Sequence, residues 1–434
     1  MNPMWLYSQC KGLLLRRAGI LKNVGWVVSD RVMRMAVGVV ITSLVARYLG
    51  PERLGILGYA IAWVSLFSAL TGLGLDNLVV RDLVRSPDVR GEIIGTALVL
   101  RIGAGLVAAL LAPLAALLVA SRRDAMLLVV FLSPTAILAS VETFALWFQS
   151  QLRMRQVVLG RLAGFVPGAL IRIALVALNA SLPWFALANT IETAIAAGML
   201  GATFVWGGRI RQSLRYRACR ARKLLFEAWP LFLSSLTVMV YLRIDQVLVP
   251  LLGGEYQAGI YGAAVRISEL WYVVPTSIVA AAYPAVIAVE ARGTAEFLAA
   301  LHKLFRALTA LAYLVGLVLT LGGPWIIRLL FGMKFTAAAP VLAIHVWSGV
   351  FVALGTARSL WDTSQGATKL AFYSTAEGAI VNIILNLLLV PSYGAVGSAL
   401  ATLVAYAHAG IFSYFIHPRG RPVAIIMARS LLLI

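Results

Sequence analysis

The chain has 434 residues, of which 61% are hydrophobic and only 12% are charged. A soluble protein of this length needs more charge to cover its surface, so the composition excludes that class and indicates an integral membrane protein. The apolar segments lack the alternating pattern of membrane strands, which favours helices over a β-barrel.

The first 23 residues, MNPMWLYSQCKGLLLRRAGILKN, contain no small-residue cleavage site after an apolar run. They are therefore predicted to be a retained basic arm rather than a signal peptide. Apolar windows long enough to cross about 30 Å of hydrocarbon then recur along the whole chain. They predict twelve transmembrane helices, at residues 24–48, 54–80, 93–119, 125–147, 157–178, 183–206, 224–252, 258–288, 305–323, 336–361, 372–391 and 394–416.

These helices predict an all-α membrane protein built from two bundles of six. The N-terminal bundle covers residues 24–206 and the C-terminal bundle covers residues 224–416, with a basic loop at 207–223 between them. Residues 417–434 form a C-terminal tail. Its stretch AIIMARSLLLI is either a membrane-surface helix or the start of a further span, and the sequence leaves both open.

The net charge of +20 raises the question of nucleic-acid binding, but the positions of the charges exclude it. Most lysines and arginines fall in alternate connections, which identifies those as cytoplasmic and places both termini there. The predicted outer segments hold only Arg47, Arg53, Arg122, Arg123, Arg328 and Lys334. Cys10 and Cys219 both lie on the predicted cytoplasmic side, so we expect no disulfide. The scattered histidines suggest no metal site.

The densest basic run, RIRQSLRYRACRARK, lies in the loop between the two bundles. Such a run is typical of a loop that fixes membrane topology, and it also suits contact with anionic lipid or with a protein.

Arginines inside the predicted helices are the most informative charges. Each one costs about 2.5–3.5 kcal/mol at a helix centre on the insertion scale, so these side chains are not expected to face lipid. They must face carboxylates, a polar cavity or the membrane boundary. The residues are Arg31, Arg34, Arg101, Arg161, Arg172, Arg243, Arg266 and Arg358.

Carboxylates inside the helices offer partners for some of these arginines. Asp30 and Arg34 are four residues apart, as are Arg358 and Asp362, and Arg266 precedes Glu269 by three, so each pair shares a helix face. Arg243 and Asp245 are two apart and point in different directions, which predicts pairing across helices. Internal pairing and ligand contact both remain open for each arginine.

A repeated motif reveals how the chain is organised. LGPERLGILGYA begins at Leu49, and LGGEYQAGIYGAA begins at Leu252. Six predicted helices separate the copies, an even number, so both copies face the same side of the membrane. This predicts two bundles related by a pseudo-twofold axis along the membrane normal, with a central cleft that opens to each side in turn. Prolines 167, 275 and 284 are predicted to bend their helices.

Several stretches resemble those of bacterial polysaccharide and O-antigen flippases, a family of the multidrug/oligosaccharidyl-lipid/polysaccharide exporter superfamily. RIDQVLVPLLGGEYQAGIYGAAVRISELWYVVPTSIVAAAYP, from Arg243 to Pro284, is similar to the seventh and eighth helices of that family. VARYLGPERLGILGYAIAWVSLFSALTGLGLDNLVVRDLVR is similar to its first and second helices, and LLFGMKFTAAAPVLAI and VPSYGAVGSALAT to two later connections. The resemblance covers nearly the whole chain.

The resemblance implies transport of an undecaprenyl-diphosphate-linked oligosaccharide from the cytoplasmic to the outer leaflet of a bacterial inner membrane, for surface polysaccharide such as O-antigen. It also implies a cationic cavity lined by arginines of the first, seventh and eighth helices. The matching positions are Arg31, Arg34, Arg243 and Arg266. Arginine suits this role because it binds phosphate oxygens bidentately.

Carboxylates and aromatic residues complete the predicted site. Related transporters exchange their substrate for H+ or Na+, and a buried carboxyl group can carry a proton. The candidates for coupling or substrate release are Asp30, Asp245, Glu269 and Glu377, although static charge pairing explains them equally well. Trp271 and Tyr272 are candidate sugar contacts. Other glycan-assembly membrane proteins are expected partners, besides the lipid-linked oligosaccharide and membrane lipids, and no organic cofactor or metal is expected.

A multidrug exporter and a membrane-embedded enzyme are the two alternative functions. A multidrug exporter of the same superfamily would need an acidic cavity for lipophilic cations, which the buried arginines disfavour. A membrane-embedded glycosyltransferase or polysaccharide polymerase would need a large outer loop or metal-binding acids, whereas the outer connections here are short. We therefore expect a transporter rather than an enzyme.

Overall fold

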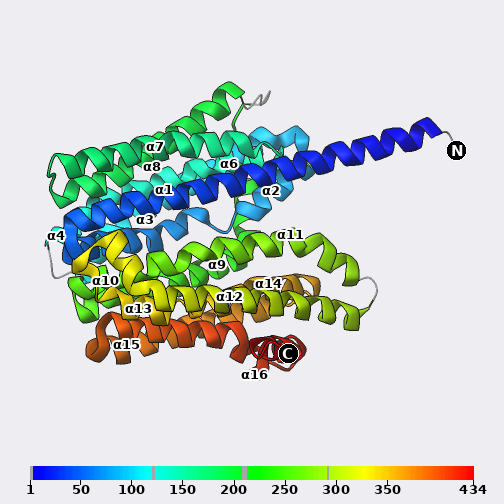
Figure 1. The fold of residues 1–434 in the computed structure, drawn as a ribbon. Helices are drawn as coiled ribbons and strands as arrows, with labels where there is room; N and C mark the ends of the chain where they lie inside the picture. Colours follow the sequence, from blue (N-terminus) through cyan, green and yellow to red (C-terminus); the bar gives the residue numbers. More distant parts are fainter. Residues whose placement is uncertain (1–2, 120–122, 208–212, 291–292) are drawn as a thin grey trace. The chain divides into compact units, whose positions relative to one another are not determined.

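The computed structural model describes residues 3–119, 123–207, 213–290 and 293–434, with the backbone alone at 3–25, 27–29, 31, 32 and 123. Every regular element in these ranges is helical (Figure 1). Ten of the described ranges are long and apolar enough to cross a membrane. Two of them, Met33–Arg85 and Thr368–Ile416, contain a break, at Gly50 and Gly394, so the ten ranges supply twelve crossing helices. The predicted all-α membrane fold is confirmed.

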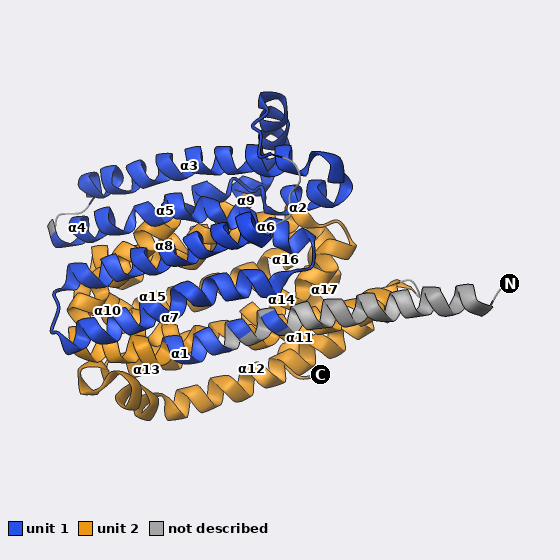
Figure 2. Cartoon of the chain, turned by 90° about the horizontal axis from the view of Figure 1, so that it is seen from above, with its two compact units in different colours: residues 1–38, 67–233 blue, residues 39–66, 234–434 orange. Residues whose placement is uncertain are grey.

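The chain divides into two compact units, which Figure 2 shows in different colours. Unit 1 comprises residues 1–38 and 67–233, and unit 2 comprises residues 39–66 and 234–434. The units follow the order of the predicted bundles, but the outer half of the first helix is grouped with unit 2 and the basic loop with unit 1. The bundle boundaries themselves remain a prediction.

Most of unit 1 is a set of helices that follow α1 (Pro3–Gly72), a helix shared with unit 2. They are α2 (Asp76–Arg85), η1 (Pro87–Val89), α3 (Arg90–Val119), α4 (Arg123–Leu132), α5 (Pro134–Leu138), η2 (Ala139–Glu142), α6 (Thr143–Ser150), α7 (Met154–Ala177) and α8 (Leu182–Gly207). The helix predicted at 125–147 is thus broken. Pro134 has no N–H for the Val130 carbonyl, and the Ser133 hydroxyl donates to that carbonyl instead, at 3.0 Å.

Unit 2 begins within α9 (Ala218–Gly253), which also starts in unit 1. Its other elements are α10 (Glu255–Glu269), η3 (Leu270–Tyr272), α11 (Val273–Glu290), α12 (Thr294–Phe331), η4 (Met333–Phe335), α13 (Ala338–His345), α14 (Ser348–Ser364), α15 (Thr368–Ala407), the π-helix η5 (His408–Phe412), α16 (Ser413–Ile416), η6 (Pro418–Gly420) and α17 (Arg421–Leu431). The helix predicted at 258–288 is interrupted at η3, because Pro275 has no N–H for the Trp271 carbonyl. By contrast, α7 and α11 continue through Pro167 and Pro284.

The C-terminal tail forms a short helix, α17, that packs on unit 2. The helix α17 has 11 residues, a length of about 16 Å, which is too short to cross about 30 Å of hydrocarbon. Val423, Ala424 and Met427 are fully buried in the same apolar core as Phe305 and Leu308 of α12. This helix therefore covers one side of unit 2.

The two copies of the repeated motif have the same backbone conformation. Gly50 has φ 73° and ψ 174°, and Gly254 has φ 86° and ψ 172°, a conformation that side chains rarely allow. A further glycine lies five residues after each, at Gly55 and Gly259, and the two helices touch there. The contact lies within unit 2 and explains why residues 39–66 are grouped with it.

Candidate functional site

Four intramembrane arginines of unit 1 have described side chains, and each is paired with a carboxylate. The pairs are Arg34–Asp30, Arg101–Asp76, Arg161–Glu142 and Arg172–Glu192. The first joins Arg34 Nη2 to Asp30 Oδ2 at 2.9 Å along one face of α1, as its spacing predicts. The side chain of Arg31 lies outside the described residues, so its predicted role stays a prediction.

Arg358 of unit 2 is held by contacts with other protein groups. Its guanidinium donates to the carbonyls of Ala409 and Gly410 at 2.7 and 2.8 Å and pairs with Asp362 at 3.3 Å, as predicted. It also stacks on the Tyr414 ring, with its central carbon 3.8 Å from the ring centroid. The side chain is only 8% exposed, so Arg358 holds α14 against the π-helix η5 and is closed to a large ligand.

The two remaining arginines lie together in unit 2. Arg243 is carried by α9 and Arg266 by α10, and both lie within electrostatic reach of Glu269 at the end of α10. Asp245 also interacts electrostatically with Glu269 and with Arg243. We call Arg243, Asp245, Arg266 and Glu269 the charge cluster. Four residues predicted from the sequence are thus brought together in one unit.

The two carboxylates of the charge cluster have different surroundings. Asp245 is 5% exposed and accepts hydrogen bonds from the Tyr261 hydroxyl, from the Thr402 hydroxyl at 3.4 Å and from the backbone N–H of Gln246 at 2.8 Å. These donors satisfy its oxygens and join α9 to α10 and α15. Glu269 is half-buried and lies among Arg243, Asp245 and Arg266. Of the two carboxylates, Glu269 is therefore the one whose charge most affects Arg243 and Arg266.

The two predicted aromatic contacts, Trp271 and Tyr272, have different surroundings. Trp271 is 8% exposed and packs against Gly349, where an added β carbon would lie 2.4 Å from the indole ring. In this structure it is a core side chain. Tyr272 is half-buried, interacts electrostatically with Glu269 and lies with its hydroxyl 3.1 Å from that of Ser348. The proposed sugar contact therefore concerns Tyr272.

Glu377 lies apart from the charge cluster and has partners that the sequence did not predict. Its two carboxylate oxygens lie 3.2 Å from His408 Nε2 and 3.1 Å from His417 Nε2. The imidazoles come from η5 and the end of α16, 31 and 40 residues away. No sequence spacing signals such a contact. Among the described residues, no group of three His, Cys, Asp or Glu side chains could hold a metal ion.

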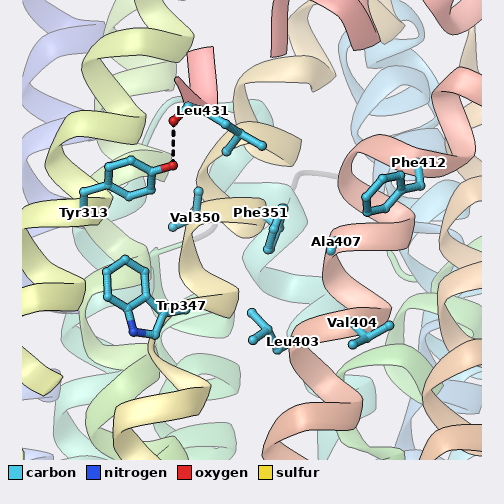
Figure 3. A pocket seen from close by; sticks show the side chains of 9 residues that line it. All are labelled: Tyr313, Trp347, Val350, Phe351, Leu403, Val404, Ala407, Phe412 and Leu431. Carbon is cyan, nitrogen blue, oxygen red and sulfur yellow. Dashed lines mark hydrogen bonds between the residues drawn. The ribbon is translucent and has the colours of Figure 1, made fainter. Parts of the chain in front are cut away.

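Unit 2 also contains an apolar groove of about 440 Å³. Figure 3 shows the residues that line it, which are Tyr313, Trp347, Val350, Phe351, Leu403, Val404, Ala407, Phe412 and Leu431. The Tyr313 hydroxyl is already bonded to the Leu431 carbonyl at 2.7 Å. The lining carries no charged side chain, so this groove does not suit an anion.

The charge cluster has the chemistry to bind and release an anion. With both carboxylates ionised, its two positive and two negative charges cancel. When Glu269 is protonated, one negative charge is lost and the cluster carries a net positive charge, which favours phosphate oxygens. The state of one carboxyl group can thus set the affinity of the cluster for an anionic ligand.

Comparison with known proteins identifies the family of this chain. A model of the family described as "Polysaccharide biosynthesis protein" matches residues 20–290. The chain is 28% identical over 201 residues to the probable flippase AglR of Haloferax volcanii, an alignment covering 44% of this chain and 40% of that protein. It is 25% identical over 253 residues to the probable low-salt glycan biosynthesis flippase Agl15 of the same organism, covering 53% and 50%. The chain thus spans half or less of the length of these curated relatives.

Solved structures share the fold. The lipid II flippase MurJ, in an inward closed conformation, superposes with a TM-score of 0.72 at 15% identity, covering 95% of this chain and 91% of MurJ. A MOP superfamily transporter from Pyrococcus furiosus superposes with a TM-score of 0.65 at 15% identity, covering 95% and 96%. At this identity the likeness establishes the fold alone.

Proposed function

Because the chain belongs to the polysaccharide biosynthesis protein family, we propose that it is a flippase for an undecaprenyl-diphosphate-linked oligosaccharide. In this proposal it moves the substrate from the cytoplasmic to the outer leaflet by alternating access. The observation that carries the proposal is the charge cluster, where Arg243 and Arg266 both interact electrostatically with Glu269 inside a membrane-spanning unit. The names of the two curated relatives, both probable flippases, support it.

Solvation explains why such a substrate needs the protein. A sugar-diphosphate headgroup cannot enter hydrocarbon, because its charges and hydroxyls would lose their water partners. Arg243 and Arg266 replace part of that water around the diphosphate, and Tyr272 contacts the adjoining sugar. The polyprenyl chain stays in the surrounding lipid. Arg31 and Arg34 of the first helix remain proposed substrate contacts.

Ion coupling is part of the proposal. Glu269 competes with the diphosphate for the two arginines, so the ionisation state of this carboxylate sets how tightly the cluster holds the substrate. Entry of H+ or Na+ down its gradient is the proposed source of energy for the cycle. Asp30, Asp245 and Glu377 remain further candidates, although the donors around Asp245 favour a structural role there.

The proposed setting is the bacterial cytoplasmic membrane, with both termini in the cytoplasm as the charge distribution predicts. O-antigen or another surface glycan is the proposed product, made together with other glycan-assembly membrane proteins. A multidrug exporter is the second candidate, since the fold is shared with transporters of the MOP superfamily. Two arginines at the cluster favour an anionic substrate over a lipophilic cation.

Genetic deletion in the source organism tests the function directly. We expect loss of surface glycan and accumulation of a lipid-linked oligosaccharide in the cytoplasmic leaflet, identified by mass spectrometry of extracted lipids. Wild-type protein should restore export, whereas R243A and R266A should each reduce it at least about tenfold at equal protein level, the effect of losing about 1.4 kcal/mol of binding.

A matched control uses Arg53, the exposed arginine in the first copy of the repeated motif. R53A removes the same charge from a residue at the protein surface and should leave export unchanged. Full export by the double variant R243A/R266A would disprove the role of the charge cluster. An unchanged lipid-linked glycan pool after deletion would disprove the flippase itself.

A further inference from the structure

The segment from Ser213 to the first four turns of α9 is docked on unit 1 by specific contacts. The backbone N–H of Arg215 donates to the Gly91 carbonyl at 3.3 Å, and that of Arg217 donates to the Thr96 hydroxyl at 3.1 Å. Glu92 binds the Arg217 and Arg220 side chains at 3.2 and 2.6 Å. The most basic segment of the chain is therefore fixed in place.

These contacts use one face of α9 and leave the opposite face exposed. Ala221, Leu224 and Ala228 are at most 4% exposed and face unit 1. Around the helix from them, Leu225, Phe226 and Trp229 are 40%, 79% and 56% exposed. An exposed aromatic stripe at helical spacing suits a membrane boundary, where aromatic side chains are enriched.

Uncompensated positive charge adjoins this stripe. Arg215 and Arg222 are both exposed, and neither has a carboxylate within 4.0 Å among the residues that the structure describes. Arg222 and Phe226 are four residues apart, which is about 6 Å along a helix. The headgroup layer on each side of a bilayer is about as thick, so a guanidinium at the phosphate leaves the aromatic ring at the start of the acyl chains.

We propose that Arg215, Arg222, Phe226 and Trp229 form a binding surface for an anionic phospholipid. The two guanidinium groups contact the phosphate, and the aromatic rings lie along the upper part of the acyl chains. Charge complementarity selects this occupant over a zwitterionic lipid, since each basic residue near an anionic leaflet contributes about 1 kcal/mol. The bound lipid fixes how deeply unit 1 lies in the membrane. This anchoring role is separate from the proposed transport function.

Contact quenching of Trp229 by brominated lipids tests the proposal. The full-length protein is reconstituted in vesicles with a fixed minor fraction of acyl-brominated phosphatidylglycerol or phosphatidylcholine. The chain has 11 tryptophans, so the Trp229 signal is obtained by subtracting that of W229F. We expect brominated phosphatidylglycerol to quench this signal about twofold or more beyond phosphatidylcholine, as selective binding requires.

Substitutions distinguish a site from general attraction. R215Q/R222Q should abolish the difference between the two lipids, and R306Q, which removes an exposed arginine of α12, should preserve it. Native mass spectrometry of the same variants, scoring retained phosphatidylglycerol, provides a readout independent of tryptophan. Equal quenching by both lipids in the wild-type protein would overturn the proposal. None of these measurements depends on transport, so failure of the flippase proposal would leave them interpretable.

Discussion

Gly55 and Gly259 contact each other's helices in a reciprocal way. A β carbon on Gly55 would lie 2.0 Å from the Glu255 carbonyl oxygen, and one on Gly259 would lie 1.9 Å from the Pro51 carbonyl oxygen. Each carbonyl belongs to the residue four positions before the other glycine. The two copies of the motif therefore meet through a local twofold relation, with backbone against backbone.

Alanine at either position should separate the two helices. We expect G55A and G259A each to lower the free energy of unfolding by about 1–3 kcal/mol, the usual cost of overpacking. The thermal unfolding midpoint of purified protein measures this. G58A and G262A are matched controls one turn away, because an added β carbon there meets nothing within 4 Å. If all four variants unfold alike, the close approach is not required.

Loss of an arginine should affect folding at one position and transport at another. R358Q removes the partner of Asp362 and two hydrogen bonds to η5, and we expect it to cost about 3–5 kcal/mol of stability. R266Q affects an exposed side chain, so its unfolding midpoint should stay close to that of the wild type while export is lost. Thermal unfolding and surface-glycan assays on the same variants measure both. If R266Q lowered the unfolding midpoint while R358Q abolished export without a loss of stability, the roles assigned to the two arginines would be reversed.

The hydroxyl of Tyr261 should stabilise unit 2 through Asp245. It donates to the Asp245 carboxylate and lies 3.1 Å from the Thr402 hydroxyl, all in the buried interior. Y261F leaves a buried carboxylate short of one donor, and we expect a loss of about 1–3 kcal/mol. Chemical denaturation followed by tryptophan fluorescence measures this, with Y256F, an exposed tyrosine of the same helix, as the control. Equal stability of Y261F and the wild type would show that water or another donor replaces the hydroxyl.

Glu92 should protect the basic segment from protease. Its carboxylate binds Arg217 and Arg220, and trypsin cleaves after such residues only when the backbone can leave the surface. We expect E92Q to be cut between residues 215 and 223 several-fold faster than the wild type, while global stability changes by less than about 1 kcal/mol. Mass spectrometry of timed digests measures the rate. E296Q, on α12, is the control, and unchanged cleavage in E92Q would mean that the backbone contacts suffice.

The sequence predicted the helices and the charge pairs that depend on local spacing. Hydrophobic windows identified the spans, and the four-residue spacing predicted Arg34–Asp30 and Arg358–Asp362. A bend at Pro275 was also predicted from its missing backbone donor, whereas the helices that contain Pro167 and Pro284 are continuous. These features follow from interactions within one helix.

Contacts between distant helices could not be predicted in this way. His408 and His417 reach Glu377 because the chain turns at Gly394, between the two halves of α15. Trp271, a candidate sugar contact, packs its indole against Gly349, where the absence of a side chain makes room for the ring. In each case tertiary packing determines where the side chain lies, and no periodic pattern in the sequence predicts that packing.

The equivalence of Gly50 and Gly254 also aligns the residues before and after them. On that alignment Arg243, Asp245, Arg266 and Glu269 correspond to Val39, Ile41, Ala62 and Ser65. The repeat therefore keeps the glycine corner in both copies, whereas the four residues of the charge cluster occur in the second copy alone. The two halves share a corner of the backbone and differ in the ionisable groups placed on either side of it.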